Sequence, residues 1–144
     1  MFNNITVAII TPTHTKKPFD TGLVLAKKFN SNLTIIECLY KIPPKFYFFE
    51  TKSDKKITEG QIRNLKQELN NWKGIAEKEG LKINTKFALT DSIAHWIIDH
   101  VKENKVNLLV VGYPKLSMIE ENHYDDIINM IHHKAHCNIL TTKN

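Results

Sequence analysis

The sequence has almost no arginine, although it is rich in lysine. Arg63 is the single arginine, and the net charge of +5 comes from lysines spread along the chain. Proteins that read nucleic acids concentrate arginine with lysine on one face, because the guanidinium group pairs bidentately with phosphate and guanine. The charge pattern therefore predicts a solvated, lysine-rich exterior and no nucleic-acid partner.

Cysteine is scarce, and long apolar runs are missing. Cys38 and Cys137 both lie in apolar segments, where free thiols behave as small hydrophobic groups, and two cysteines do not indicate a disulfide framework. No apolar run approaches the roughly 20 residues that span a membrane. Met1 leads directly into a strand-like segment without the parts of a signal peptide. We therefore expect a cytoplasmic protein with no membrane partner.

Strong metal-binding and catalytic motifs are also lacking. The only group of metal-ligand types is His123, His132, His133, His136 and Cys137. His132 and His136 are expected to share a helix face, but the spacing matches no zinc pattern, and histidines at a helix C-terminus complement its dipole without metal. We expect no metal site.

No nucleophile elbow, P-loop or dinucleotide fingerprint occurs. Thr11, Thr13 and His14 come nearest to a hydroxyl with a neighbouring base, and we interpret them as loop residues. The sequence therefore predicts a protein that is not an enzyme.

The composition is that of one ordinary globular domain over residues 1–144. Hydrophobic residues make up 42% of the chain and charged residues 24%. A chain of this length buries roughly two-thirds of its unfolded surface, which is enough for a real core but leaves no room for a second domain.

Apolar, β-branched runs predict buried strands at 5–10, 33–39 and 108–111. Residues 81–89 alternate between apolar and polar side chains, which indicates an edge strand. A short final strand over 138–142 is also expected at a sheet edge.

Helical periodicity separates these strands. The clearest helix covers 57–79, and a long aromatic loop over 40–56 is expected before it. The other helices are expected to begin near Pro18 and Asp20, after capping oxygens in 90–92, and at about Tyr124.

The alternation predicts an α/β fold with a parallel sheet and helices on both faces, because right-handed crossovers place them there. Ligands in such sheets bind beyond the carboxyl ends of the strands, where the strand order reverses. Residues 10–14 and 112–116 are therefore expected to form the crevice.

Three segments carry a family resemblance: LTIIECL, DSIAHWIIDHVKENKVNLLVVG and HHKAHCNILTT. With the element order, they resemble the universal stress protein family over nearly the whole chain. The resemblance implies a five-stranded, mainly parallel, Rossmann-like sheet of the adenine nucleotide alpha hydrolase-like type. It also implies a homodimer through the last strand, formed by Asn138, Ile139, Leu140, Thr141 and Thr142.

ATP-binding members of that family resemble one another in a loop written G-x-x-G, nine residues, then G and Ser or Thr. Gly112 matches the first glycine, but Lys115 stands at the second, Asp125 at the third and Asp126 at the hydroxyl position. Bulk and negative charge oppose a phosphate there. We expect the two aspartates to cap a helix N-terminus instead. An aspartate often found at the end of the first strand is replaced by Ile10.

The sequence thus favours a stress-response binding or regulatory protein that takes no cofactor and acts on an unknown protein partner or small ligand. An adenine-nucleotide protein, with ATP held by an altered loop beside the aromatics around Tyr47, is the alternative, and a nucleotide hydrolase is a further one. The candidate crevice residues are Ile10, Thr11, Pro12, Thr13, Leu39, Gly112, Tyr113, Lys115, Asp125 and Asp126.

Overall fold

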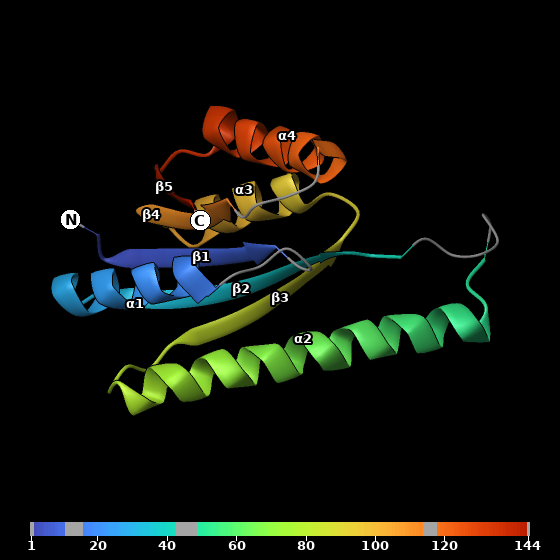
Figure 1. The fold of residues 1–144 in the computed structure, drawn as a ribbon, viewed down its shortest axis with the longest axis horizontal. Coiled ribbons are helices and arrows are strands. Elements are labelled where there is room, and N and C mark those ends of the chain that lie inside the picture. Colours follow the sequence, from blue (N-terminus) through green and yellow to red (C-terminus); the bar gives the residue numbers. More distant parts are fainter. Residues whose placement is uncertain (1, 11–15, 43–48, 114–117, 144) are drawn as a thin grey trace.

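The computed structural model describes residues 2–10, 16–42, 49–113 and 118–143. Strands and helices alternate along the chain, as the sequence predicts (Figure 1). The elements are β1 (Asn4–Ile10), α1 (Lys16–Phe29), β2 (Asn32–Tyr40), α2 (Lys52–Lys78), β3 (Asn84–Thr90), α3 (Ile93–Glu103), β4 (Leu108–Tyr113), α4 (Met118–Lys134) and β5 (Asn138–Lys143).

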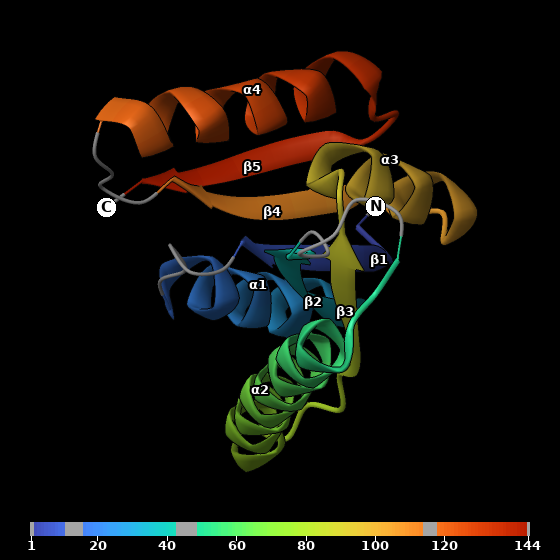
Figure 2. The ribbon, with the colours of Figure 1, turned by 90° about the vertical axis from the view of Figure 1, so that its right-hand side faces the viewer.

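The five strands form one parallel sheet in the order β3-β2-β1-β4-β5. Helices α1 and α2 lie on one face and α3 and α4 on the other (Figures 1 and 2). This arrangement confirms the predicted fold class and places β3 and β5 at the edges, as expected. The strand order reverses between β1 and β4, which fixes the crevice position that such sheets use.

The core has two halves because the central strands are buried on both faces. Side chains alternate along β1, so Val7 and Ile9 pack under α1 and α2, whereas Ala8 and Ile10 pack under α3 and α4. The sheet is therefore completely enclosed along its centre.

Helix α1 approaches β1 closely at Gly22. A Cβ atom placed on Gly22 would lie 2.3 Å from Cγ2 of Val7, far inside van der Waals contact. A glycine is needed here because the helix backbone itself packs against the strand.

Helix α2 begins earlier than the predicted residue 57. Thr51 caps it: the Asp54 N–H donates to Thr51 Oγ1 (3.1 Å) and the Thr51 N–H donates to Asp54 Oδ2 (2.8 Å). This capping box extends the helix into the segment that was expected to be loop. Its amino end reaches beyond the sheet (Figure 1). Residues 43–48 of the expected 40–56 loop, Tyr47 among them, lie outside the described residues.

Strand β3 begins at Asn84, three residues after the predicted start at Leu81. Gly80 adopts a φ of 80°, and the Leu81 N–H donates to the carbonyl of Ala76 (3.0 Å). The backbone N–H of Leu81 therefore bonds to a carbonyl at the end of α2, and Leu81 is not part of strand β3.

The predicted capping of α3 is wrong in detail. Ser92 occupies the N-cap position, but its side chain bonds to no helix amide; its Oγ lies 2.7 Å from Nδ1 of His95.

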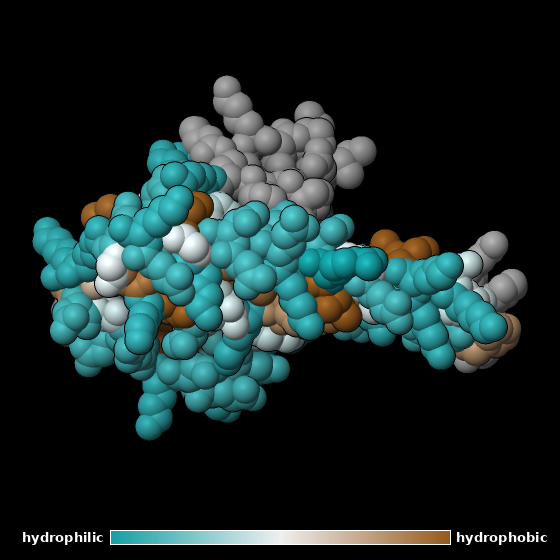
Figure 3. All heavy atoms as spheres, turned by 90° about the horizontal axis from the view of Figure 1, so that it is seen from below, coloured by the Kyte–Doolittle hydropathy of each residue, from teal (hydrophilic) through white to brown (hydrophobic). Residues whose placement is uncertain are grey.

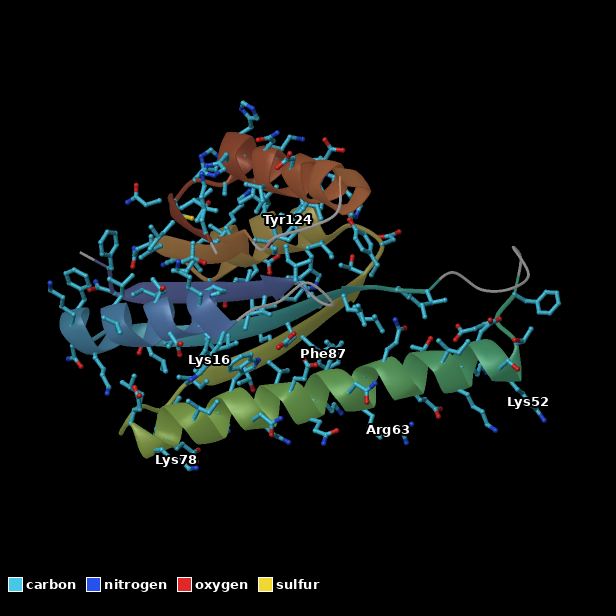
Figure 4. All side chains as sticks on the ribbon, in the orientation of Figure 1. Lys16, Lys52, Arg63, Lys78, Phe87 and Tyr124 are labelled. Carbon is cyan, nitrogen blue, oxygen red and sulfur yellow. The ribbon has the colours of Figure 1, made fainter. Side chains whose placement is uncertain are left out.

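The side of the molecule formed by α2 is mostly hydrophilic (Figure 3). Lys52, Arg63 and Lys78 point from α2 away from the sheet and are exposed (Figure 4). None of the described helices has both the length and the apolar character needed to cross a membrane.

Candidate functional site at the carboxyl edge of the sheet

The candidate crevice lies where β1 and β4 end side by side. Val7 pairs with Val110 and Ala8 with Val111, so Ile10 and Gly112 come to the same edge of the sheet. The expected crevice residues Thr11, Pro12, Thr13 and Lys115 lie outside the described residues, as do the side chain of Tyr113 and residue His14.

Gly112 is held tightly from one side by α1. A Cβ atom on Gly112 would lie 3.0 Å from Cγ of Pro18 and 3.7 Å from Oγ1 of Thr142. The glycine therefore lets the first turn of α1 close against β4. This is a packing reason for the first glycine of the resembling motif, and it requires no ligand.

Gly112 is engaged from the other side by α4. The hydroxyl of Tyr124 donates a hydrogen bond to the Gly112 carbonyl, and Tyr124 is buried. Tyr124 points from α4 toward the sheet (Figure 4). Sequence reasoning missed this tyrosine because it treated residue 124 as the start of a helix.

Asp125 and Asp126 are not helix caps, so that prediction is wrong. Helix α4 begins at Met118, which makes them its eighth and ninth residues. Only the first four N–H groups of a helix lack partners within the helix. The backbone amides at 125 and 126 are therefore committed to the helix ladder. The sequence concealed the early start because the residues just before Tyr124 are polar and show no apolar stripe.

The other expected crevice residues that the structure describes differ in burial. Ile10 is buried and packs in the core beneath α3 and α4, while Leu39 is half-buried near the end of β2. The next residue, Tyr40, contacts the ring of His123 from α4, with 5.1 Å between centroids. Burial raises the pKa of Tyr40. No sequence signal connected these two rings.

A carboxylate is buried close to this edge. Glu37 is fully buried on β2 and accepts a hydrogen bond from the indole of Trp72. Burial raises the pKa of its neighbour Cys38, and the negative charge of Glu37 raises it further. Cys38 is therefore a protonated, unreactive thiol.

The prediction that His132 and His136 share a helix face is wrong. Helix α4 ends at Lys134, so His136 lies beyond it and does not share a helix face with His132. Both cysteines are free, and burial raises the pKa of Cys137. Within the described part of the chain, no three histidine, cysteine, aspartate or glutamate side chains come together.

Strand β5 forms one edge of the sheet and pairs with β4. Leu140 is 38% exposed there, whereas Thr142 is buried. The Oγ1 atom of Thr142 has no hydrogen-bond partner among the described residues. The strand therefore presents an open edge with an apolar side chain.

Comparison with known proteins gives a consistent result. The sequence model of the Universal stress protein family matches residues 1–143. Universal stress protein YxiE of Bacillus subtilis strain 168 is 27% identical over 150 residues, which cover 99% of this chain and all of that protein.

Solved structures share the fold. The universal stress protein UspA from Lactobacillus plantarum matches with a TM-score of 0.79 and 14% identity over 98% of this chain and 97% of its own. The universal stress protein from Archaeoglobus fulgidus, solved in complex with dAMP, matches with a TM-score of 0.65 and 14% identity over 98% of both chains. With a family match over almost its entire length, this chain belongs to the universal stress protein family.

Proposed function

We propose that this chain is a binding protein of the stress response that does not take ATP at its carboxyl edge. One observation carries the proposal: residues 125 and 126, which correspond to the last glycine and the hydroxyl of the ATP-binding loop, lie two turns inside α4. A phosphate that is held by a helix backbone needs free N–H groups, and within a helix these occur only in the first turn.

Charge supports the same conclusion. Asp125 and Asp126 put two carboxylates where the loop offers a glycine and a hydroxyl, and Asp126 is exposed. Two like charges 4 Å apart repel by about 4 kcal/mol at an effective dielectric near 20. A triphosphate approaching this side of α4 therefore meets repulsion in place of hydrogen bonds.

Calorimetric titration of the whole chain with Mg²⁺-ATP tests this proposal. We expect no saturable heat with ATP at about 1 mM, because a site weaker than that contributes less than about 4 kcal/mol of binding free energy. A dissociation constant in the micromolar range would contradict the proposal. Native mass spectrometry of the purified protein gives an independent reading, because a retained nucleotide adds its mass.

The competing candidate is an adenine-nucleotide protein with an altered loop. The relative from Archaeoglobus fulgidus, solved with dAMP, favours it, because a monophosphate needs fewer phosphate contacts than ATP. Titration with AMP beside ATP separates the two: saturable heat with AMP alone would favour this candidate.

We propose no catalytic role. Nucleotide hydrolysis requires a bound nucleotide and a base or metal to activate water. Cys38, a buried thiol near the end of β2, has a raised pKa and stays protonated. Phosphate release from ATP, measured with a coupled assay, is expected to equal that of buffer alone.

A homodimer through β5 is the proposed assembly. The strand forms an open sheet edge, and edges of this kind pair readily with another chain. Leu140 supplies an exposed apolar side chain on it. We expect Leu140→Lys to convert a dimer to a monomer in native mass spectrometry. Ile57→Lys is the matched control, because Ile57 is 43% exposed on α2, which packs on β3 at the opposite edge of the sheet.

A further inference from the structure

The opposite, amino-terminal edge of the sheet carries an unusual set of polar side chains. On the face beneath α3, the first residues of three neighbouring strands are polar, whereas the following residues Ala8, Ile36 and Ala88 are apolar core. Strand register aligns the polar residues across the sheet, in the pairs Asn4 with Asn32, Thr6 with Thr34, and Thr34 with Asn84.

Two adjoining hollows lie over these residues, and Asn104 at the end of α3 lines both. The larger has a volume of about 300 Å³, and its polar lining is Asn4, Thr6, Asn32, Thr34, Asn84 and Asn104. The smaller has about 250 Å³ and is lined by Lys86, Trp96, Asp99, His100, Glu103 and Asn104. Small-molecule sites are usually lined mainly by apolar groups. The lining of these two hollows is mostly polar, which indicates a polar ligand.

Part of the lining is held in place by hydrogen bonds. Asn32 Nδ2 donates to Asn4 Oδ1 (3.2 Å), and Asn4 Nδ2 donates to the carbonyl of Lys105 (3.2 Å). The backbone N–H of Asn4 donates to Asn107 Oδ1 (2.7 Å). The floor of the larger hollow is therefore arranged before any ligand arrives, which lowers the entropy cost of binding.

Other groups in the same hollow remain available. Among the described residues, the hydroxyl of Thr34 and the side-chain amide of Asn84 make no hydrogen bond within the protein. Each offers both a donor and an acceptor. A ligand with several hydroxyl groups satisfies such a mixture, because each hydroxyl also donates and accepts.

The shared wall is fixed through His100. Lys86 Nζ donates to Asn104 Oδ1 (3.5 Å), so Asn104 Nδ2 faces His100. Asn104 Nδ2 lies 2.9 Å from the His100 carbonyl oxygen and 3.1 Å from His100 Nδ1. An amide nitrogen only donates, so Nδ1 accepts and the ring proton lies on Nε2. That nitrogen donates to Thr6 Oγ1 (3.1 Å). The histidine is therefore neutral.

No charged side chain of the described residues lines the larger hollow, and the charges that line the smaller hollow have both signs, so an uncharged ligand fits best. The carboxylates of Asp99 and Glu103 and the negative end of the α3 dipole oppose an anion. The ammonium group of Lys86 opposes a cation. The ring of Trp96, stacked on His100 with an interplanar angle of 8°, adds an aromatic wall.

We propose that this amino-edge hollow is a ligand site for a small neutral polyhydroxyl compound, such as a monosaccharide or a cyclitol. The site lies at the edge of the sheet opposite the carboxyl-edge crevice. It therefore does not depend on whether the chain binds a nucleotide.

The test is a titration of the ¹⁵N-labelled full chain with D-glucose and, separately, with myo-inositol, followed by NMR. The side-chain amides of Asn32 and Asn84 and the indole N–H of Trp96 are expected to shift saturably with one of these probes. The dissociation constant is expected in the millimolar range, about 4 kcal/mol of binding free energy. Shifts that stay linear with both probes, or that cluster around Gly112, would overturn the proposal.

Variants connect the shifts to the hollow. Asn84→Ala and Thr34→Val, which replaces threonine by a side chain of similar shape, are each expected to weaken binding about fivefold, because each removes a hydrogen bond worth about 1 kcal/mol. Asn70→Ala is the matched control, since Asn70 is an exposed asparagine on α2. Thermal unfolding of each variant checks that it folds.

Equal affinity in all three variants would contradict the site. Glucose 6-phosphate tests the charge argument, because the carboxylates should make it bind more weakly than glucose. Tighter binding of the phosphorylated sugar would overturn the assignment to a neutral ligand.

Discussion

The indole nitrogen of Trp72 donates a hydrogen bond to the carboxylate of Glu37, with 2.6 Å between Nε1 and Oε1. Glu37 is fully buried in β2, and Trp72 comes from the carboxyl-terminal third of α2. The ring of Phe19 packs on Trp72 with 4.4 Å between centroids. This polar contact lies within an apolar layer and, together with buried residues such as Leu69 and Ala76, holds α2 on the sheet.

Trp72→Phe is expected to lower the free energy of unfolding by about 1–3 kcal/mol, because it removes a hydrogen bond from a buried carboxylate while keeping an aromatic ring. Urea unfolding measures the change. Trp96→Phe is the control, since the Trp96 indole makes no hydrogen bond to the described residues. Equal losses in the two variants would show that ring size, and not the hydrogen bond, sets the effect.

Gly22→Ala is expected to destabilise the chain by about 1–3 kcal/mol, because the new methyl group overlaps Cγ2 of Val7. Gly74→Ala is the matched control: a Cβ there meets no atom within 4 Å, so it should stabilise α2 by about 0.5–1 kcal/mol. Thermal unfolding reports both. Adding Val7→Ala to Gly22→Ala should restore part of the loss, and failure to do so would contradict the clash.

The order of elements and the edge positions of β3 and β5 were predictable, because apolar runs and alternation depend only on local sequence. The start of α2 was missed, although Thr51 and Asp54 form a recognisable capping box. The start of α4 was missed because residues 120–123, just before Tyr124, are polar and continue no apolar stripe. Helix starts depend on capping and tertiary contacts as much as on periodicity.

The sites were less predictable. The position of the crevice followed from topology, but its contacts did not: Pro18 and Tyr124 reach Gly112 from helices on opposite faces. The amino-edge residues went unnoticed because Asn32 and Asn84 look like ordinary strand boundaries in sequence. Only strand register reveals that they lie together.

His100 predicts a pH-dependent stability. Burial, and to a smaller extent the positive charge of Lys86, lower its pKa from 6.5 to about 4. Between these two values the unfolded chain binds a proton that the folded chain rejects. Stability is therefore complete above about pH 6.5 and falls as the pH drops toward 4, by at most about 3 kcal/mol.

Urea unfolding at a series of pH values measures this slope in the unmodified chain and in His100→Gln, which keeps a polar side chain but does not titrate. The carboxylates of Asp99 and Glu103, which line the same hollow, contribute equally to both proteins. We expect a flatter slope in His100→Gln. His133→Gln, at an exposed histidine of α4, should leave the slope unchanged. Identical slopes in all three proteins would contradict the role of His100.

The double variant Asp125→Gly with Asp126→Ser separates the two reasons for excluding ATP, because it restores the last two motif residues and removes both carboxylates, while Lys115 stays at the second glycine position. If the lack of free backbone N–H groups excludes ATP, the variant still fails to bind it, since the amides at 125 and 126 remain two turns inside α4. Calorimetry measures the binding, and circular dichroism checks that α4 persists. Micromolar ATP binding by a variant with intact α4 would show that charge alone excluded the nucleotide and that the helix argument is wrong.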